Sequence, residues 1–168
     1  MADYLIIGMP EPPSYRVAIT ANRLLTPDDH GIIFDEMMRL MTDGRIESIY
    51  FGGAVGGDTV ALKACLDVTI MDRPQLIVVV PNRLADQPKI THEISKKADT
   101  LVELANPITV SDGWRSYHIR NEYMVDHAER VVAFWNKSTK PSGTAACIRY
   151  ALKNKKPVDI IKIAGEDK

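Results

Sequence analysis

Six short apolar runs alternate along the chain with segments that carry helix-start signals. The clearest run is Gln75–Val80 (Gln-Leu-Ile-Val-Val-Val), a nearly continuous stretch of aliphatic, mostly β-branched residues. Such a run is typical of a strand in a parallel sheet that helices cover on both faces. Because strands that alternate with helices assemble as βαβ units, the sequence predicts a Rossmann-like α/β three-layer sandwich with a mostly parallel central sheet.

The same pattern places the elements along the chain. Thr26 can cap a helix and Pro27 suits its first position, so a helix is expected to start there. The proline-rich residues 9–14 predict an extended arm over residues 1–14, followed by a single domain over residues 15–168. We expect strands near residues 16–20, 46–51, 75–80, 100–104, 130–135 and 158–162, and helices near 26–43, 58–68, 86–98, 116–128 and 142–153.

Composition narrows the classes of partner. The net charge of −1 gives no overall attraction to nucleic acid or to anionic membranes, so nucleic acid is not an expected partner. No apolar run approaches the roughly 20 residues that cross a bilayer, and the N-terminus lacks a leader pattern, so we expect a cytoplasmic protein. Cys65, Cys147 and the four histidines lack ligand spacing, so no metal or cofactor is expected. The sequence is compatible with a homo-oligomer but does not determine the oligomeric state.

A glycine-rich loop, residues 52–59 (Gly-Gly-Ala-Val-Gly-Gly-Asp-Thr), lies between a predicted strand and a predicted helix. Glycine lets backbone approach a ligand closely, and a helix N-terminus favours an anion, so the loop predicts a phosphate contact. It matches neither the dinucleotide-binding fingerprint nor the Walker A sequence. A tight turn that closes a βα unit is the alternative. Asp58 could bind a ribose hydroxyl or cap the helix.

Further polar groups follow other strands and could meet the same ligand. Residues 142–144 (Ser-Gly-Thr) form a second small turn before a helix, Arg120 offers a bidentate fork, and Trp135 could stack on a base. The alternative for Arg120 is a solvated position on the helix surface, and the alternative for Trp135 is packing in the core. The candidate ligand-binding residues are Asn22, Arg23, Gly52, Gly53, Ala54, Gly56, Gly57, Asp58, Thr59, Arg120, Asn121, Trp135, Ser142, Gly143 and Thr144.

These motifs together resemble the SLOG superfamily, which includes DprA-type DNA-processing proteins, LOG-type phosphoribohydrolases and YpsA/YspA-like proteins. The resemblance runs from about Arg16 to Ile163 and is carried by residues 17–23, 51–62 and 117–126, with the strand 131–135 and the turn 142–144. Order and spacing look most like the YpsA/YspA branch. The resemblance implies that the two small-residue turns and the Arg-Asn pair line a pocket for a nucleotide or a nucleotide derivative.

One departure from the family bears on catalysis. LOG-type hydrolases carry Gly-Gly-x-Gly-Thr-x-x-Glu, but here Gly143-Thr144 is followed at the glutamate position by Cys147. We therefore expect a sensor, carrier or sequestering protein for a nucleotide or an ADP-ribose-like ligand. One alternative is an N-glycosidase for nucleoside monophosphates with a relocated carboxylate, Glu122 or Asp126. A second is a DprA-like DNA-associated protein, which the net charge and the few aromatic residues disfavour.

Overall fold

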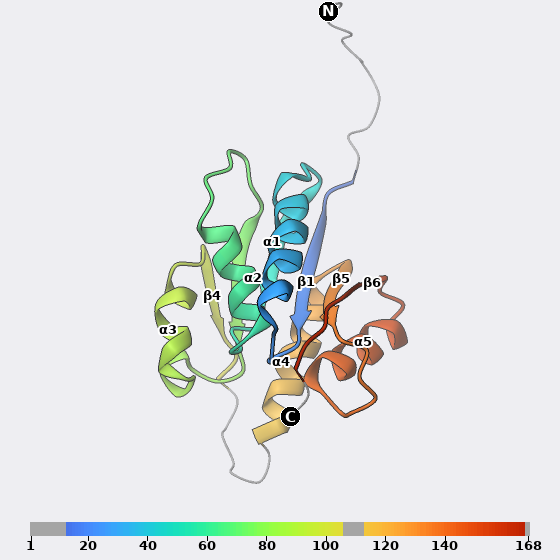
Figure 1. Cartoon of the computed structure of the whole chain (residues 1–168). Helices are drawn as coiled ribbons and strands as arrows, with labels where there is room; N and C mark the ends of the chain where they lie inside the picture. The colour runs from blue at the N-terminus through green and yellow to red at the C-terminus, as the bar shows by residue number, and fades with distance from the viewer. Residues whose placement is uncertain (1–12, 106–112, 167–168) are drawn as a thin grey trace, which may run out of the picture.

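A six-stranded sheet forms the middle layer of the structure, a computed structural model that describes residues 13–105 and 113–166 (Figure 1). Every strand pair in it is parallel, and the strand order is β4-β3-β2-β1-β5-β6. The predicted strands are confirmed to within one residue at each end. Their bounds are β1 (Tyr15–Ala21), β2 (Ile46–Phe51), β3 (Gln75–Val80), β4 (Thr100–Glu103), β5 (Arg130–Trp135) and β6 (Val158–Lys162).

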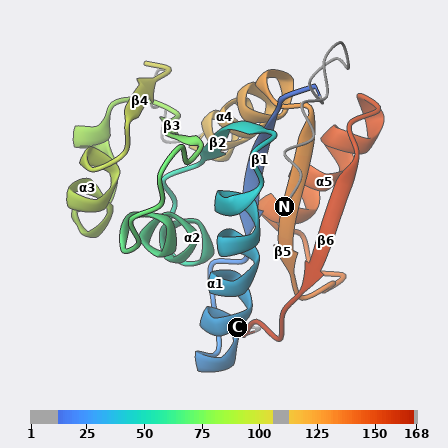
Figure 2. The same cartoon turned by 90° about the horizontal axis from the view of Figure 1, so that it is seen from above.

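Helices cover both faces of this sheet, as a three-layer sandwich requires (Figure 2). One face packs against α1, α2 and α3, and the other packs against α4 and α5. The predicted Rossmann-like α/β class is therefore confirmed. The helices are α1 (Pro27–Thr42), α2 (Gly57–Leu66), α3 (Lys89–Lys96), α4 (Gly113–His127) and α5 (Gly143–Lys153), and a short 3₁₀ turn, η1 (Leu84–Asp86), precedes α3.

Two helix starts differ from the expected ones. The helix expected from residue 86 begins at Lys89, because Pro88 takes the N-cap position after the 3₁₀ turn. α4 begins at Gly113, three residues before the expected start, so Trp114 stands on the first turn of a helix. Most of the predicted arm, residues 1–12, and most of the loop before α4, residues 106–112, lie outside the described residues.

Strand β1 lies at the centre of the sheet and divides the core into two clusters. Val17 and Ile19 pack toward α1 and α2, whereas Ala18 packs toward α4 and α5, as the two-residue period of a strand demands. All three side chains are fully buried. The carboxyl end of β1 is thus held rigidly between the layers.

The strand order reverses between β1 and β5, and this reversal determines where a ligand can bind. β1 leads into α1 on one face, and β5 leads into α5 on the other, so the two connecting loops diverge (Figure 2). In open α/β sheets, ligands bind in the crevice that such a divergence leaves beyond the carboxyl ends of the strands.

Candidate ligand-binding site

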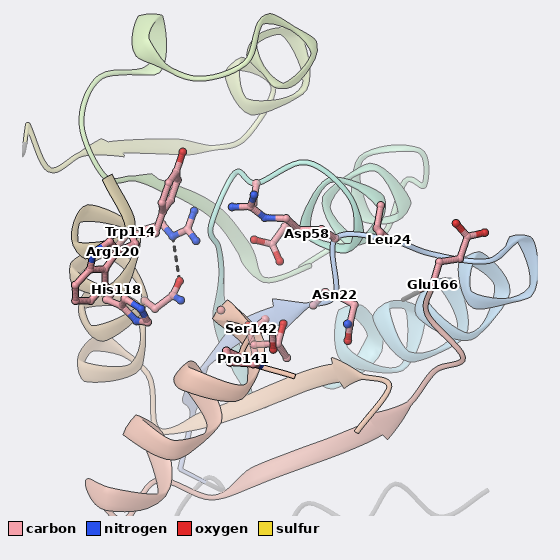
Figure 3. A pocket seen from close by; sticks show the side chains of 17 residues that line it. Asn22, Leu24, Asp58, Trp114, His118, Arg120, Pro141, Ser142 and Glu166 are labelled. Carbon is pink, nitrogen blue, oxygen red and sulfur yellow. Dashed lines mark hydrogen bonds between the residues drawn. The ribbon is translucent and has the colours of Figure 1, made fainter. Parts of the chain in front are cut away.

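A cavity of about 400 Å³ lies at this crevice (Figure 3). Helix α4 supplies Trp114, His118 and Arg120 on one side, while Leu24 and Glu166 lie on the opposite side. The complete lining consists of Thr20, Ala21, Asn22, Arg23, Leu24, Ala54, Asp58, Trp114, Tyr117, His118, Arg120, Asn121, Pro141, Ser142, Gly143, Thr144 and Glu166.

Most of the candidate residues meet in this cavity, although they come from four separate parts of the chain. The candidates that line it are Asn22, Arg23, Ala54, Asp58, Arg120, Asn121, Ser142, Gly143 and Thr144. The candidates outside the lining are Gly52, Gly53, Gly56, Gly57, Thr59 and Trp135.

The glycines of the first loop serve close packing between loops. Gly56 has φ +99°, and a Cβ there would lie 2.0 Å from the carbonyl oxygen of Arg23. A Cβ at Gly57 would lie 2.4 Å from Ala21 Cβ, and the Gly57 amide donates to Asn22 O at 2.9 Å. The loop after β2 therefore presses against the loop after β1. Its glycines shape the wall of the cavity, while Ala54 and Asp58 reach its surface.

Arg120 is a buried cation in the cavity wall, only 5% exposed. Its Nη1 donates to Gly52 O at 2.6 Å. Its Nε donates to Asn121 Oδ1 at 3.1 Å, the bond that is dashed in Figure 3. Its Cζ lies 5.4 Å from the centre of the Tyr117 ring. Burial lowers the pKa of the guanidinium, whereas the nearby Asp58 raises it. These contacts fix a planar donor group in one orientation, as recognition of an anion requires.

Asp58 is the buried acid of the site. The N-cap of α2 is Gly56, so capping, one of the two roles considered for Asp58, is wrong. Its side chain lines the cavity although the residue is only 7% exposed. Burial raises the pKa of this carboxyl to about 6, although Arg120 and Arg23 lower it by their charge.

Gly52 lies beside the two buried charges. A Cβ at this position would lie 2.7 Å from Asp58 Oδ2 and 3.0 Å from Arg120 Cζ. The acid and the guanidinium therefore both lie against the side of Gly52 where a Cβ would be. A side chain at Gly52 would displace both groups, so this glycine supports the site from behind.

The N-terminus of α5 forms another wall of the cavity. Ser142 is the N-cap, and its Oγ accepts from the Ala145 amide at 3.1 Å. Gly143 and Thr144 open the helix and line the cavity, and Thr144 is only 4% exposed. A helix N-terminus offers amide donors and a partial positive charge, so this wall suits an anion.

Several residues of the lining, among them Trp114, His118 and Glu166, are not among the candidate ligand-binding residues. The rings of Trp114 and His118 meet edge to face with centroids 5.3 Å apart. Glu166 reaches the cavity because its amide donates to Leu24 O at 3.2 Å. That contact joins the C-terminal segment to the loop after β1, and no local pattern near residue 166 indicates it.

The two carboxylates suggested for a relocated catalytic role lie elsewhere. Glu122 and Asp126 are exposed and outside the cavity lining. Asp126 Oδ1 accepts a hydrogen bond from the Tyr150 hydroxyl at 2.9 Å. The hypothesis that this face of α4 points into the pocket is therefore wrong, because the buried face carries Arg120 and Asn121 instead.

Within residues 13–105 and 113–166, no group of three or more His, Cys, Asp or Glu side chains could hold a metal ion. No helix in the same part of the chain is long and apolar enough to cross a membrane.

Comparison with known proteins identifies the fold. No protein-family model and no curated protein matches the sequence. DNA processing protein A from Helicobacter pylori is 21% identical, with a TM-score of 0.68 over 92% of this chain and 69% of that one. The molybdenum cofactor binding protein from Rippkaea orientalis is 18% identical, with a TM-score of 0.63 over 94% and 80%. The chain therefore has the Rossmann-like fold of DprA-type proteins.

The two neighbours bind different ligands. The first is described as binding single-stranded DNA and the second as binding a molybdenum cofactor. At these identities the likeness extends to the fold alone. The expectation from net charge that nucleic acid is not a partner gains no support from this comparison.

Proposed function

We propose that this chain binds a nucleotide or a nucleotide-derived, ADP-ribose-like phosphate ligand, as a sensor, carrier or sequestering protein of the YpsA/YspA-like branch of the SLOG superfamily. The observation that carries the proposal is the cavity at the strand-order reversal. In it, the N-terminus of α5 meets the buried Arg120 and Asn121. Amide donors, a fixed guanidinium and a side-chain amide together suit a phosphate.

The cavity also has features for the rest of such a ligand. Trp114 is 64% exposed at the cavity wall and offers an aromatic face for a base. Arg23 is exposed, and its Cζ lies 5.5 Å from the Tyr117 ring centre. An exposed cation in the cavity lining can contact a second phosphate, as an ADP-ribose-like ligand would require.

Binding is favoured over hydrolysis by the residue at the glutamate position. Cys147 is 2% exposed and packs in the core cluster under α4 and α5. Burial raises the pKa of its thiol to about 12, so it is neutral at physiological pH. A neutral thiol cannot stabilise the positive charge that develops on a sugar during glycosidic cleavage.

One observation keeps the N-glycosidase as a second candidate. Asp58 places a carboxyl group inside the cavity, where a sugar would lie if a phosphate occupied the α5 end. A buried carboxyl with a raised pKa is a common feature of glycosidic acid catalysts.

The anion site can be tested at Gly143, where an added Cβ would meet only Asn121 Nδ2, at 4.0 Å. Gly143→Asp places a carboxylate at the first position of α5, where a negative charge stabilises the helix by about 0.3–1 kcal/mol. We expect unchanged or higher thermal stability, but phosphate-ligand affinity lowered by at least about tenfold, or 1.4 kcal/mol. Calorimetric titration with AMP, GMP, CMP, UMP and ADP-ribose measures this.

Gly143→Asn is the matched control, since it adds the same volume without the charge. It should bind these ligands more tightly than Gly143→Asp. The proposal fails if the wild-type chain binds none of the five compounds, or if the aspartate and asparagine variants bind them equally well.

A further inference from the structure

The candidate site has two chemically unlike ends. One is the N-terminus of α5, which follows β5. The other is Asp58 in the first turn of α2, which follows β2. β1 lies between these two strands, so their carboxyl ends are two strand spacings apart, about 9–10 Å. A single ligand that fills the cavity therefore meets the amide donors of α5 at one end and the Asp58 carboxylate, with Arg120 near it, at the other.

Packing explains only part of the environment of Asp58. The residue is not the helix cap, since Gly56 holds that position. The backbones of Ala54 and Ala21 lie close enough to its carboxylate to lower the pKa of the carboxyl. A carboxylate has about four lone-pair positions, so acceptor capacity is left for a group inside the cavity.

The charges around Asp58 determine which kind of ligand group its carboxylate can bind. Burial raises the pKa of the carboxyl to about 6, Arg120 of α4 and Arg23 of the loop after β1 oppose this rise by their charge, and the neighbouring Cys147 thiol of α5 is neutral. The carboxylate can therefore be charged at neutral pH, and a phosphate beside it would be repelled. A neutral donor, such as a sugar hydroxyl, can bind there.

On the basis of the proposed function, we propose that Asp58 recognises the vicinal hydroxyls of a ribose whose phosphate binds at the N-terminus of α5. The cavity then selects ribose phosphates over their deoxy counterparts. The geometry behind this assignment is the buried carboxylate on one side of β1 and the helix N-terminus on the other. The specificity comes from the penalty of leaving a buried acceptor without a donor.

The first test uses the wild-type chain and a ligand series that differs only in hydroxyls. AMP, 2′-deoxy-AMP and 2′,3′-dideoxy-AMP are titrated by calorimetry, beside ribose 5-phosphate and 2-deoxyribose 5-phosphate. We expect affinity to fall with each hydroxyl removed, by at least about tenfold over the series. Equal affinities for the ribose and dideoxy compounds overturn this inference while leaving the proposed phosphate site intact.

The second test changes the acid. In Asp58→Asn the affinity ratio between AMP and 2′,3′-dideoxy-AMP should shrink several-fold, because the amide replaces one acceptor oxygen with a donor. The control is Asp67→Asn, which alters an exposed acid at the other end of α2 and should leave the ratio unchanged. A ratio preserved in a folded Asp58→Asn variant counts against the assignment. If no phosphate compound binds the wild-type chain, the inference falls together with the proposed function.

Discussion

At the scale of single residues, the glycines of the chain divide into those that packing requires and those that it does not. Gly56 combines φ +99° with a backbone oxygen 2.0 Å from where its Cβ would be. Gly31, on the exposed side of α1, has no atom within 4 Å of the same position. A glycine-rich sequence alone does not separate these cases, because both a ligand contact and a loop contact demand a missing side chain.

Gly56→Ala should therefore lower the free energy of unfolding by about 3 kcal/mol or more, through both backbone strain and the clash with Arg23 O. Gly31→Ala, the matched control, should raise it by up to about 1 kcal/mol, since alanine is the better helix former. Urea denaturation followed by circular dichroism measures both. If Gly56→Ala proved as stable as the wild type, the close approach of the two loops would be refuted.

At the scale of elements, the C-terminal segment after β6 is held to the start of α1 by one buried acid. Asp29 is fully buried and accepts hydrogen bonds from the amides of Thr26, Ala164 and Gly165 at 2.8–2.9 Å. Burial opposes ionisation, but these hydrogen bonds hold the pKa of Asp29 below its ordinary value of 3.8. The same segment brings Glu166 to the cavity.

Asp29→Asn should loosen this segment and cost about 1–3 kcal/mol of unfolding free energy. Because the folded pKa is lowered, the stabilisation is fully present above pH 3.8 and is lost as the pH falls through the folded value. The difference in unfolding free energy between Asp29→Asn and the wild type should therefore be smaller at pH 3 than at neutral pH. Hydrogen exchange at Ala164 and Gly165 should become faster. Asp28 is an exposed neighbour, so Asp28→Asn should change neither the unfolding free energy nor the exchange rates. Equal effects of the two variants would contradict the inference that Asp29 holds the C-terminal segment to α1.

Elements with strong local signals could be predicted from the sequence, and elements set by long-range contacts could not. The six strands follow from runs of β-branched residues such as Gln75–Val80, and the start of α1 follows from Pro27 at its first position. α3 starts late because the 3₁₀ turn before it depends on tertiary contacts, such as the Leu84 amide to Glu103 Oε1 at 3.0 Å. The local sequence pattern around residues 84–89 does not indicate such a long-range contact.

At the scale of the whole molecule, the sheet order assembles the site. The rule that ligands bind beyond the carboxyl ends of parallel strands selects the loops after all five strands from β1 to β5. Of these, the loops after β1, β2 and β5 meet at the cavity. The rule could not determine the rotation of α4 about its axis. Arg120 and Asn121 are buried on that helix, whereas Glu122 and Asp126 face outward. Both faces carry polar residues, so hydrophobic periodicity does not distinguish them.

The last prediction concerns turnover by the molecule as a whole. We expect no enzymatic release of free base from AMP, GMP, CMP, UMP or their deoxy forms. The physical reason is that Cys147 is buried and neutral, while Glu122 and Asp126 lie outside the cavity. A sensitive chromatographic assay for free base measures this, and Glu122→Gln and Asp126→Asn should behave as the wild type does. Base release that survives these two changes and disappears in Asp58→Asn would instead make the chain a hydrolase, with the buried acid of α2 as its carboxylate.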